Sequence, residues 1–393
     1  MHFSYRHTMI AAYIGYITQA IINNFAPLLF LTFSSTWGIP LPRMALLILI
    51  NFGIQLVVDL LSARYIDRIG YRPCIIAAHV FAALGLVGLG VFPHFFASPY
   101  AGILLAAVLY AVGGGLIEVL ISPIVESCPT THKESEMSLL HSFYCWGSVL
   151  TIALSTAFFA CFGVNRWPVL ACLWALIPLL NALYFRFVPL RQLNEDPEAA
   201  SVPLFRLAKM PLLWLFILLM FCSGASEQAM SQWASGFAEA GLGVSKTLGD
   251  LAGPCMFSVL MGLARLLSSR LTLRMPIEKI IFSCGLLCIA SYLLASLSPV
   301  SALSLLGCAL CGLSVGVMWP GTFSMASFSL RGGGTALFAL LALAGDLGCM
   351  GGPAVIGAAS SLLGGSLKQA MLLGVIFPVL LITGLMLYKK REQ

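Results

Sequence analysis

Apolar runs of about twenty residues follow one another along almost the whole 393-residue chain, with short polar stretches between them. About twenty residues at 1.5 Å each are needed for a helix to cross roughly 30 Å of hydrocarbon. The first run is too long for the core of a signal peptide, so we expect it to be a retained span. The pattern predicts membrane-spanning helices at residues 8–33, 43–63, 74–92, 100–126, 138–162, 167–187, 210–233, 249–271, 277–297, 300–325, 334–361 and 367–388.

A polar stretch in the middle of the chain separates the first six predicted spans from the last six. It covers residues 188–209 and contains NEDPEAASVP, so we expect a linker there between two halves at 1–187 and 210–393. A short phrase also recurs near the same end of the second span of each half, as DLLSAR at 59–64 and RLLSSR at 265–270. Two related halves with a binding site near the membrane midplane are typical of secondary transporters.

Composition and charge agree with a chain that lies mostly in the membrane. Charged residues make up 9% of the sequence, against about 25% in soluble domains. Twelve spans place both termini on one side, and that side holds most of the lysines and arginines, whereas the opposite loops hold Arg43, Arg166, Lys246 and Lys368. The positive-inside rule therefore predicts cytoplasmic termini. We expect the lipid bilayer, and no nucleic acid, as a partner.

The run at 109–129, LYAVGGGLIEVLISPIVESCP, carries Glu118 in its interior. An acid at the centre of a spanning helix costs on the order of 3 kcal/mol, so it marks a functional site by default. Desolvation favours the protonated form of a carboxyl group, and Glu118 is therefore our candidate for coupling proton entry to solute movement. The small residues at 113–115 let neighbouring helices come close to this segment.

Polar side chains recur on other spans of the first half. Asn23 and Asn24 lie near mid-depth in the first span, where we expect a cavity. A stripe along the second span, with a spacing of four residues, consists of Asn51, Gln55 and Asp59. This spacing places the three side chains on one face of a helix. Such a stripe either faces a pathway or serves as hydrogen-bond glue between helices.

The second half contributes candidates on three spans. Glu227 and Gln228 lie toward the end of the seventh span, where they either face a substrate or begin to meet water. Asp346 lies near the centre of the eleventh span among small residues, and it either lines the pathway or caps a neighbouring helix. Arg265 occupies the place on the eighth span that Asp59 has on the second. We expect these two residues to be structural or gating charges.

The types of polar residue limit the classes of function. Most charges at mid-depth are acidic, which disfavours an anionic substrate and leaves neutral polyols or cations. The glycine runs lack the Lys-Ser/Thr of a phosphate-binding loop, so ATP-driven pumping by this chain is not expected. The 12 cysteines lack metal-ligand spacing, and no nucleophile and base share a depth. We therefore expect no metal site, no bound cofactor and no enzyme activity.

The loop after the second span resembles a signature of the major facilitator superfamily. It reads ARYIDRIGYR at 63–72, similar to G-x-x-x-D-R-x-G-R-R/K with alanine at the usual glycine. The resemblance implies an all-α membrane protein of about twelve helices in two pseudosymmetric six-helix halves. It also implies gating or structural roles for Arg64, Asp67 and Arg68.

Other stretches resemble the fucose permease branch of that superfamily, the fucose/glucose/galactose:proton symporters. GLIEVLISP at 115–123 is similar to its G-x-x-E-x-x-x-N-P motif, in which the glutamate takes part in proton coupling. NNFAP at 23–27 resembles its first-span N-D-x-x-x-P, shortened by one residue. LHSFYCWG at 140–147 resembles a fifth-span stretch where Gln and Asn contact sugar, and MWPGTF at 318–323 resembles the tenth-span F-P-T-I-F.

The departures from that branch affect the expected mechanism. Asn24 stands where the branch has aspartate, which leaves Glu118 to act alone or together with His141, a residue type that titrates near neutral pH. His141 and Tyr144 replace the sugar-contacting Gln and Asn, three residues apart and so on one helical face. In the second half, Trp319 would offer a flat apolar face to a pyranose ring.

We therefore expect a secondary active transporter that takes up a small neutral polar solute, such as a sugar or polyol, together with protons by alternating access. The proton gradient, or Na⁺ in its place, would supply the energy, and the protein would act as a monomer. One alternative is a proton antiporter that exports cationic or amphiphilic compounds. Another is a membrane receptor or scaffold without transport. The resemblance implies a bacterial inner membrane.

Overall fold

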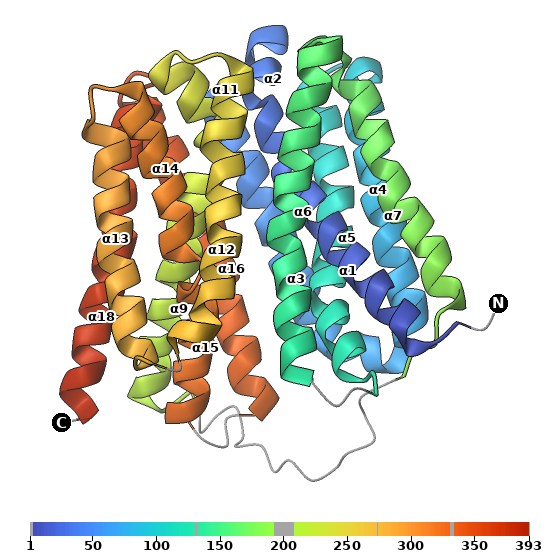
Figure 1. Ribbon diagram of the computed structural model, residues 1–393. Coiled ribbons are helices and arrows are strands. Elements are labelled where there is room, and N and C mark those ends of the chain that lie inside the picture. The colour runs from blue at the N-terminus through green and yellow to red at the C-terminus, as the bar shows by residue number, and fades with distance from the viewer. Residues whose placement is uncertain (1–2, 130–132, 192–207, 273, 331–333, 393) are drawn as a thin grey trace. The chain divides into compact units, whose positions relative to one another are not determined.

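The computed structural model describes residues 3–129, 133–191, 208–272, 274–330 and 334–392, and every regular element in these ranges is a helix (Figure 1). The all-α fold predicted from the sequence is confirmed. By its internal contacts the chain divides into two compact units. Unit 1 is Met1–Pro40 with Ile50–Pro197, and unit 2 is Leu41–Leu49 with Glu198–Gln393. Most of the predicted linker lies outside the described residues.

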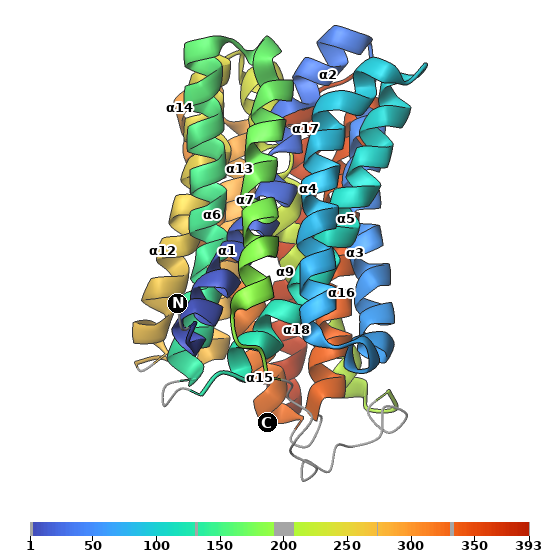
Figure 2. The ribbon, with the colours of Figure 1, turned by 90° about the vertical axis from the view of Figure 1, so that its right-hand side faces the viewer.

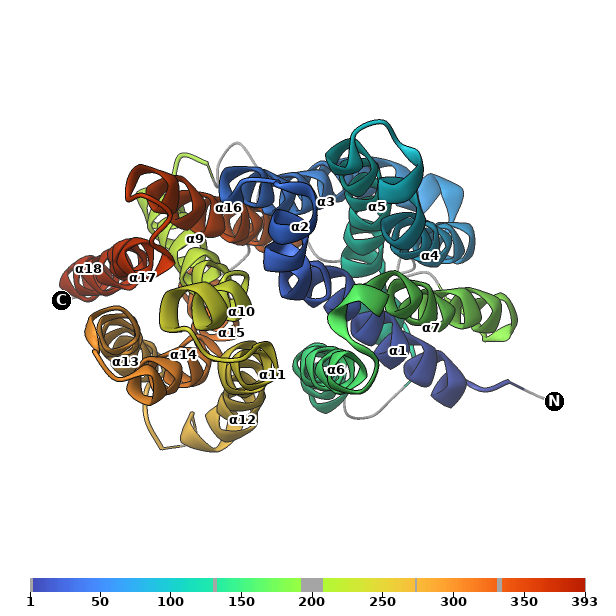
Figure 3. The same ribbon diagram turned by 90° about the horizontal axis from the view of Figure 1, so that it is seen from above.

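The described residues of unit 1, which Figure 2 shows from the side, form nine helical elements. They are α1 (Tyr5–Asn24), η1 (Ala26–Leu29), α2 (Phe30–Trp37), α3 (Leu41–Ile69, its first nine residues grouped with unit 2), α4 (Tyr71–Phe95), α5 (Pro99–Glu126), α6 (Lys133–Phe162), η2 (Val164–Arg166) and α7 (Trp167–Phe187). Helix α1 packs against α5, α6 and α7 (Figure 3). It therefore lies inside this unit.

Unit 2 has a larger number of short elements, because several of its spans are interrupted. They are α9 (Pro211–Ser231), α10 (Ala234–Gly236), η3 (Phe237–Gly241), α11 (Lys246–Asp250), η4 (Leu251–Cys255), α12 (Met256–Leu271), α13 (Ile277–Leu297), α14 (Ser301–Val315), α15 (Met318–Ser329), α16 (Gly334–Leu362), α17 (Leu367–Met371), η5 (Leu372–Val375) and α18 (Ile376–Glu392). Helix α9 packs mainly against α16 and α18.

The described residues contain 12 helical segments that are long and apolar enough to cross a membrane, and each overlaps one predicted span. The spans were predictable because the bilayer thickness fixes their length. The clearest differences lie at the ends: the first segment is Tyr5–Trp37 and the tenth is Ser301–Ser329. Prolines begin several helices, as at Pro99 of α5 and Pro211 of α9, where the missing N–H costs nothing.

The glycine run of α5 brings this helix close to two neighbours in unit 1. A Cβ atom at Gly113 would lie 2.6 Å from the Ala78 carbonyl oxygen of α4, and one at Gly115 would lie 3.0 Å from the Cα atom of Gln55 on α3. Both positions exclude a side chain unless a backbone moves. The small residues therefore hold Glu118 of α5 near the polar stripe of α3, as small residues do at membrane helix interfaces.

A buried histidine and asparagine join three helices of unit 1. His79 of α4 has no exposed surface, and its Nδ1 atom lies 2.8 Å from the Ile75 carbonyl oxygen. Asn181 of α7 places its Nδ2 atom 2.8 Å from His79 Nε2 and donates to the Ala11 carbonyl oxygen of α1 at 3.0 Å. These contacts fix α1 against α4 and α7.

Arg72, in the first turn of α4, binds the C-terminal end of α7. Its Nη1 donates to the carbonyl oxygens of Phe185 and Arg186 at 2.8 and 2.6 Å, and its Nη2 donates to that of Val188 at 2.9 Å. The last carbonyls of a helix have no intrahelical donor, so the guanidinium satisfies groups that would otherwise need water. Arg72 thereby fixes the C-terminal end of α7 against α4.

We expect Arg72→Lys to loosen the end of α7, because a single ammonium cannot reproduce the planar fork that reaches three carbonyls. The loss is about 1–3 kcal/mol of local stability, as for hydrogen bonds to charged groups. Faster amide hydrogen exchange at residues 184–190 would show it. Arg274→Lys is a matched control, since Arg274 is an exposed arginine. Equal exchange in wild type and the Arg72 variant would contradict the role.

Candidate functional site

Glu118 is hydrogen-bonded to a glutamine of the first span. The Nε2 atom of Gln19, on α1, donates to Glu118 Oε2 at 3.2 Å and to Gln55 Oε1 of α3 at 2.9 Å. Both hydrogens of this amide are therefore used. Gln19 and Gln55 are buried, whereas Glu118 is half-buried. The carboxylate thus begins a hydrogen-bonded chain that runs from α5 through α1 to α3.

The chain continues through Asn23 to the fifth predicted span. Asn23 Oδ1 accepts from Gln55 Nε2 at 3.2 Å and from Asn51 Nδ2 at 3.1 Å. The Nδ2 atom of Asn23 donates to the hydroxyl of Tyr144, on α6, at 3.4 Å. We call Gln19, Asn23, Asn51, Gln55, Glu118 and Tyr144 the amide cluster. It links α1, α3, α5 and α6 within unit 1.

Asn24 and His141 lie beside the amide cluster and have other contacts. Asn24 Nδ2 donates to the Ala20 carbonyl oxygen at 2.8 Å and to Ser148 Oγ of α6 at 3.0 Å. One hydrogen therefore bonds the backbone of α1 itself, and the other links α1 to α6. His141 is exposed, and its ring centroid lies 5.4 Å from that of Tyr16. Glu118 and Tyr144 share a network, whereas the described contact of His141 is with the Tyr16 ring.

In unit 2, three side chains of the seventh span form a second polar series. Gln228 Nε2 donates to Glu227 Oε1 at 3.1 Å, and Gln232 Nε2 donates to Gln228 Oε1 at 2.9 Å. All three are buried. The guanidinium of Arg265, on α12, also acts electrostatically on Glu227. We call Glu227, Gln228 and Gln232 the glutamine ladder, and its burial shows that this end of α9 does not fray into water.

Trp319 and Asp346 are brought near each other in unit 2. The indole ring of Trp319, on α15, lies directly against Gly345 of α16, so closely that a Cβ atom there would overlap the ring. Asp346 is the next residue of α16 and is 6% exposed. One face of the indole therefore packs against a helix, and Trp319 as a whole is half-buried.

The structure describes the side chains of two of the predicted gating charges, Arg265 and Asp59. Arg265 Nε lies 3.4 Å from the Gly316 carbonyl oxygen, at the break between α14 and α15 in the tenth span. Interrupted helices often carry the binding sites of secondary transporters. Asp59 is half-buried on α3. Arg64, Asp67 and Arg68 also lie on α3, but their side chains are outside the described part of the structure.

The sequence interpretation named Asn51 in the polar stripe of the second span without assigning it to the site, and it assigned neither Gln19 nor Ser148 to the site. Gln19 precedes Asn23 by one helical turn, and Asn51 precedes Gln55 in the same way, so the spacing of four was an available signal. Ser148 carries no such signal, because a serine in a spanning helix usually bonds its own backbone. Ser148 does so as well, through the Tyr144 carbonyl oxygen at 3.0 Å.

Among the described residues, no three His, Cys, Asp or Glu side chains are grouped so that they could hold a metal ion. The polar side chains of both units are mainly amides, carboxyls and hydroxyls. Such groups donate to and accept from the hydroxyls of an uncharged solute, and a carboxyl group can also take up a proton.

The fold and its buried polar series define a multi-pass membrane protein of the transporter class. A profile described as the Major Facilitator Superfamily matches residues 8–353, so the chain belongs to that superfamily. It is accordingly a membrane transporter and not an enzyme. A search of curated protein sequences returns no significant match.

Solved structures with the same fold come from several transporters. A bacterial homologue of the human lysosomal transporter Spinster, inward-facing and occupied, has a TM-score of 0.78 at 15% identity, covering 98% of this chain and 97% of its own. The E. coli fucose:proton symporter FucP gives 0.65 at 17% identity, covering 98% and 99%. A D-xylose–proton symporter gives 0.75 at 13% identity, covering 95% and 96%. At these identities the likeness shows the fold alone.

Proposed function

We propose that this transporter takes up a small neutral polar solute, such as a sugar or polyol, together with protons. The observation that carries the proposal is the hydrogen bond between Glu118 and Gln19, which joins a titratable group to a buried series of amides. Proton binding and solute binding then act on one network. The fucose and D-xylose symporters among the structures of the same fold support this choice.

The direction of the hydrogen bonds suggests how the two events are coupled. With Glu118 ionised, its oxygen accepts from Gln19, and each later amide donates onward until Asn23 reaches the Tyr144 hydroxyl. A protonated Glu118 carries an O–H group that must donate. We propose that the proton binds Oε2, the oxygen that faces Gln19. Gln19 can then accept this hydrogen only through its own oxygen, and turning that oxygen toward Glu118 removes the donor that Gln55 uses.

The reversal then spreads along the cluster. Once Gln55 loses the donor to its oxygen, its amide is free to turn, and Asn23 in turn loses the donor from Gln55. The hydrogen bond between Asn23 and the Tyr144 hydroxyl, at the other end of the cluster, consequently changes. We propose that the solute binds beside Asn23 and Tyr144 and senses protonation in this way. The substrate-binding roles predicted for Trp319, Glu227, Gln228 and Asp346 of unit 2 stay predictions.

Binding by the purified full-length chain is the direct test. Sugars, polyols, nucleosides and lipophilic cations are added at two pH values, and the shift in unfolding temperature is measured, since a ligand of the folded state raises stability by mass action. We expect a sugar or polyol to stabilise the protein with a pH-dependent shift. Stabilisation by lipophilic cations alone would overturn the proposal.

The relay also predicts the effect of one amide substitution. We expect Gln19→Leu to keep solute binding but to reduce its pH dependence about tenfold, because Glu118 no longer communicates with Gln55. The measurement is the solute dissociation constant as a function of pH. Thr18→Val is the control, since Thr18 is a buried neighbour on α1 whose hydroxyl donates to the Ile14 carbonyl oxygen of the same helix at 3.0 Å. A pH dependence that is unchanged in Gln19→Leu would contradict the relay.

A second candidate function is proton-driven export of cationic compounds. It is favoured by the two buried acids of unit 2, Glu227 and Asp346, which would attract a cation in a low-dielectric surrounding. Cells that produce the protein would then survive higher concentrations of lipophilic cations. The loss of that protection in Glu227→Gln, without any effect of sugars, would favour export over uptake.

We also propose that both termini face the cytoplasm of a bacterial cell, that the protein acts as a monomer and that it uses H⁺. The excess of lysine and arginine on the side of the termini supports the orientation. Reporter fusions at each terminus test it, because a cytoplasmic reporter must be active at both ends. Flux measured with H⁺ or Na⁺ gradients in proteoliposomes separates the two coupling ions.

A further inference from the structure

The hairpin of residues 235–250 joins the seventh and eighth spans at the end of unit 2 opposite the C-terminus (Figure 1). It contains η3 and α11, and η4 follows it. Both η3 and η4 are π-helical, a form that is rare in proteins and frequent at functional sites. We call residues 235–250 the 235–250 hairpin.

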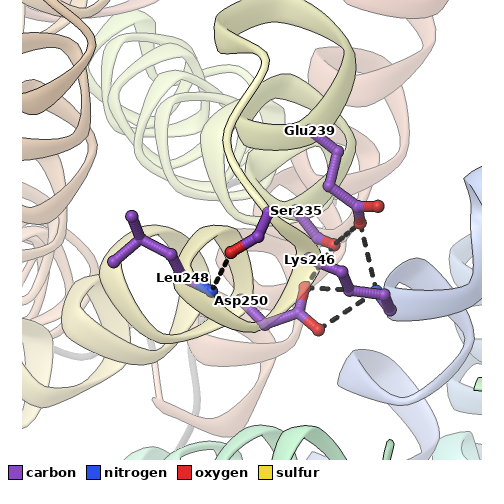
Figure 4. A network of polar contacts seen from close by, with 6 residues as sticks. Ser235, Glu239, Lys246, Leu248 and Asp250 are labelled. Atoms are coloured by element: carbon purple, nitrogen blue, oxygen red, sulfur yellow. Dashed lines mark hydrogen bonds and ion pairs between the residues drawn. The ribbon is translucent and has the colours of Figure 1, made fainter. Parts of the chain in front are cut away.

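One lysine lies between two carboxylates in this hairpin (Figure 4). Lys246 Nζ lies 3.1 Å from Glu239 Oε1 and 3.0 Å from Asp250 Oδ2. The Ser235 hydroxyl donates to Asp250 Oδ1 at 2.5 Å and lies 3.4 Å from Glu239 Oε1. The four side chains tie α10 and η3 to α11 on both sides of the turn at Gly243, whose φ is +66°.

The two carboxylates differ in burial. The side chain of Asp250 has no exposed surface, and it is held by Lys246 and Ser235. That of Glu239 is 21% exposed, so water reaches it. Within this group of four side chains, two ionised carboxylates share one ammonium. Buried charges are tolerated when they are paired, so the second carboxylate is the group that a proton would neutralise at least cost.

We propose that Glu239 is a second proton-binding site, separate from Glu118, and that proton uptake at Glu239 tightens the 235–250 hairpin. The proton comes from the water at the exposed edge of Glu239. The carboxylate becomes a carboxylic acid, Asp250 keeps Lys246, and the group of four side chains becomes neutral. The inference stands on contacts within unit 2 and does not depend on which solute is transported.

The sign of the pH effect follows from the environment of Glu239. Burial raises the pKa of the Glu239 carboxyl above its usual range, Lys246 opposes this rise, and Asp250 adds to it. In an opened hairpin the group would return to the usual value of about 4.3. The pKa of Glu239 is therefore higher in the closed hairpin than in the open one. Its protonation stabilises the closed hairpin fully below the open-state pKa, and this stabilisation is lost as the pH rises through the closed-state pKa. Acid therefore closes the hairpin.

Other titratable groups lie on the elements that pack against the 235–250 hairpin. Cys255 on η4 faces Asp250. Lys368 on α17, which packs against η3, donates from its Nζ atom to the Ser298 carbonyl oxygen at 2.6 Å. Among the described groups with an electrostatic effect on Glu239, Lys246 carries the positive charge.

The hairpin continues directly from the helix that carries the glutamine ladder, because Gln232 is followed by Trp233, α10 and η3. The Trp233 indole N–H also donates to the Pro353 carbonyl oxygen of α16 at 3.0 Å. A tighter hairpin holds this end of α9 more firmly. The pH on that side of the membrane would thereby adjust the ladder independently of Glu118.

Amide hydrogen exchange of the full-length protein tests the proposal at several pH values, after correction for the intrinsic exchange rate. In wild type we expect protection at residues 235–250 to fall about threefold or more from about pH 4.5 to about pH 8. Glu239→Gln is permanently neutral, so it should keep the protection of acid wild type throughout. Glu278→Gln, at a half-buried acid in the first turn of α13, is the matched control and should follow wild type.

Two results would overturn the inference. One is amide protection of residues 235–250 in the wild type that does not change with pH, a result that does not depend on the folding of any variant. The other is a pH dependence in Glu239→Gln equal to that of wild type. The Glu118→Gln variant separates this site from the proposed function: it should keep the hairpin profile, and failure of proton-coupled transport would leave the profile untouched.

Discussion

We expect Glu118→Gln to abolish accumulation of solute driven by a pH gradient, while exchange of solute across the membrane continues within about tenfold of the wild-type rate. Glutamine keeps the size of the side chain and an oxygen that can accept from Gln19, so the amide cluster stays folded. It cannot take up a proton. Proton movement and solute movement therefore separate, and the solute reaches equal concentrations on the two sides.

The measurement uses proteoliposomes loaded with the solute found in the binding screen. Uptake is followed with and without an imposed pH gradient, and exchange is followed with solute on both sides. Glu278→Gln is the control, because it removes an acid near a helix end and leaves the amide cluster intact. Accumulation in Glu118→Gln that still responds to the pH gradient as in wild type would remove Glu118 from the coupling step.

Gly348→Val costs about 3 kcal/mol or more of stability and prevents folding at growth temperature. Gly348 lies on α16 where it meets α9, and a Cβ atom there would overlap the Phe221 carbonyl oxygen and lie 2.9 Å from the Ala225 amide nitrogen. The obstacle is backbone, which cannot rotate away. Valine would therefore push α16 from α9 along the closest helix pair of unit 2.

The unfolding temperature of the purified variant, or its yield from the membrane, measures this effect. Gly351→Ala is the matched control on the same helix, since a Cβ atom there would lie 3.4 Å from the Phe221 ring, an ordinary contact. We expect Gly351→Ala to stay near wild type. A Gly348→Val protein as stable as that control would mean that the two helices separate at little cost.

The membrane spans could be predicted from the sequence because hydropathy and bilayer thickness together determine them. Part of the candidate site could be predicted for a related reason. Polar side chains are costly in a spanning helix, so Asn23, Gln55 and Glu118 stood out, whereas Tyr144 was predicted from the family resemblance. The structure joins these four in one network. The proposed roles of these side chains stay predictions.

The sequence alone could not predict which helix faces pack against each other. Gln19 and Glu118 are 99 residues apart and meet because the glycines of α5 allow close approach, which no local pattern encodes. Lys246 illustrates a second limit. It counted as a loop charge in the orientation argument, whereas the structure places it between two carboxylates. Contacts made through a turn depend on backbone geometry that residue types alone do not determine.

The contacts of His79 determine which of its ring nitrogens carries the proton. Asn181 Nδ2 can only donate, so His79 Nε2 must be an acceptor, and the hydrogen sits on Nδ1, where it bonds the Ile75 carbonyl oxygen. A second proton on Nε2 would force the Asn181 amide to turn its oxygen to the ring, and that oxygen would then face the Ala11 carbonyl oxygen. The imidazole is thereby held as a single neutral tautomer by the contacts of two other helices.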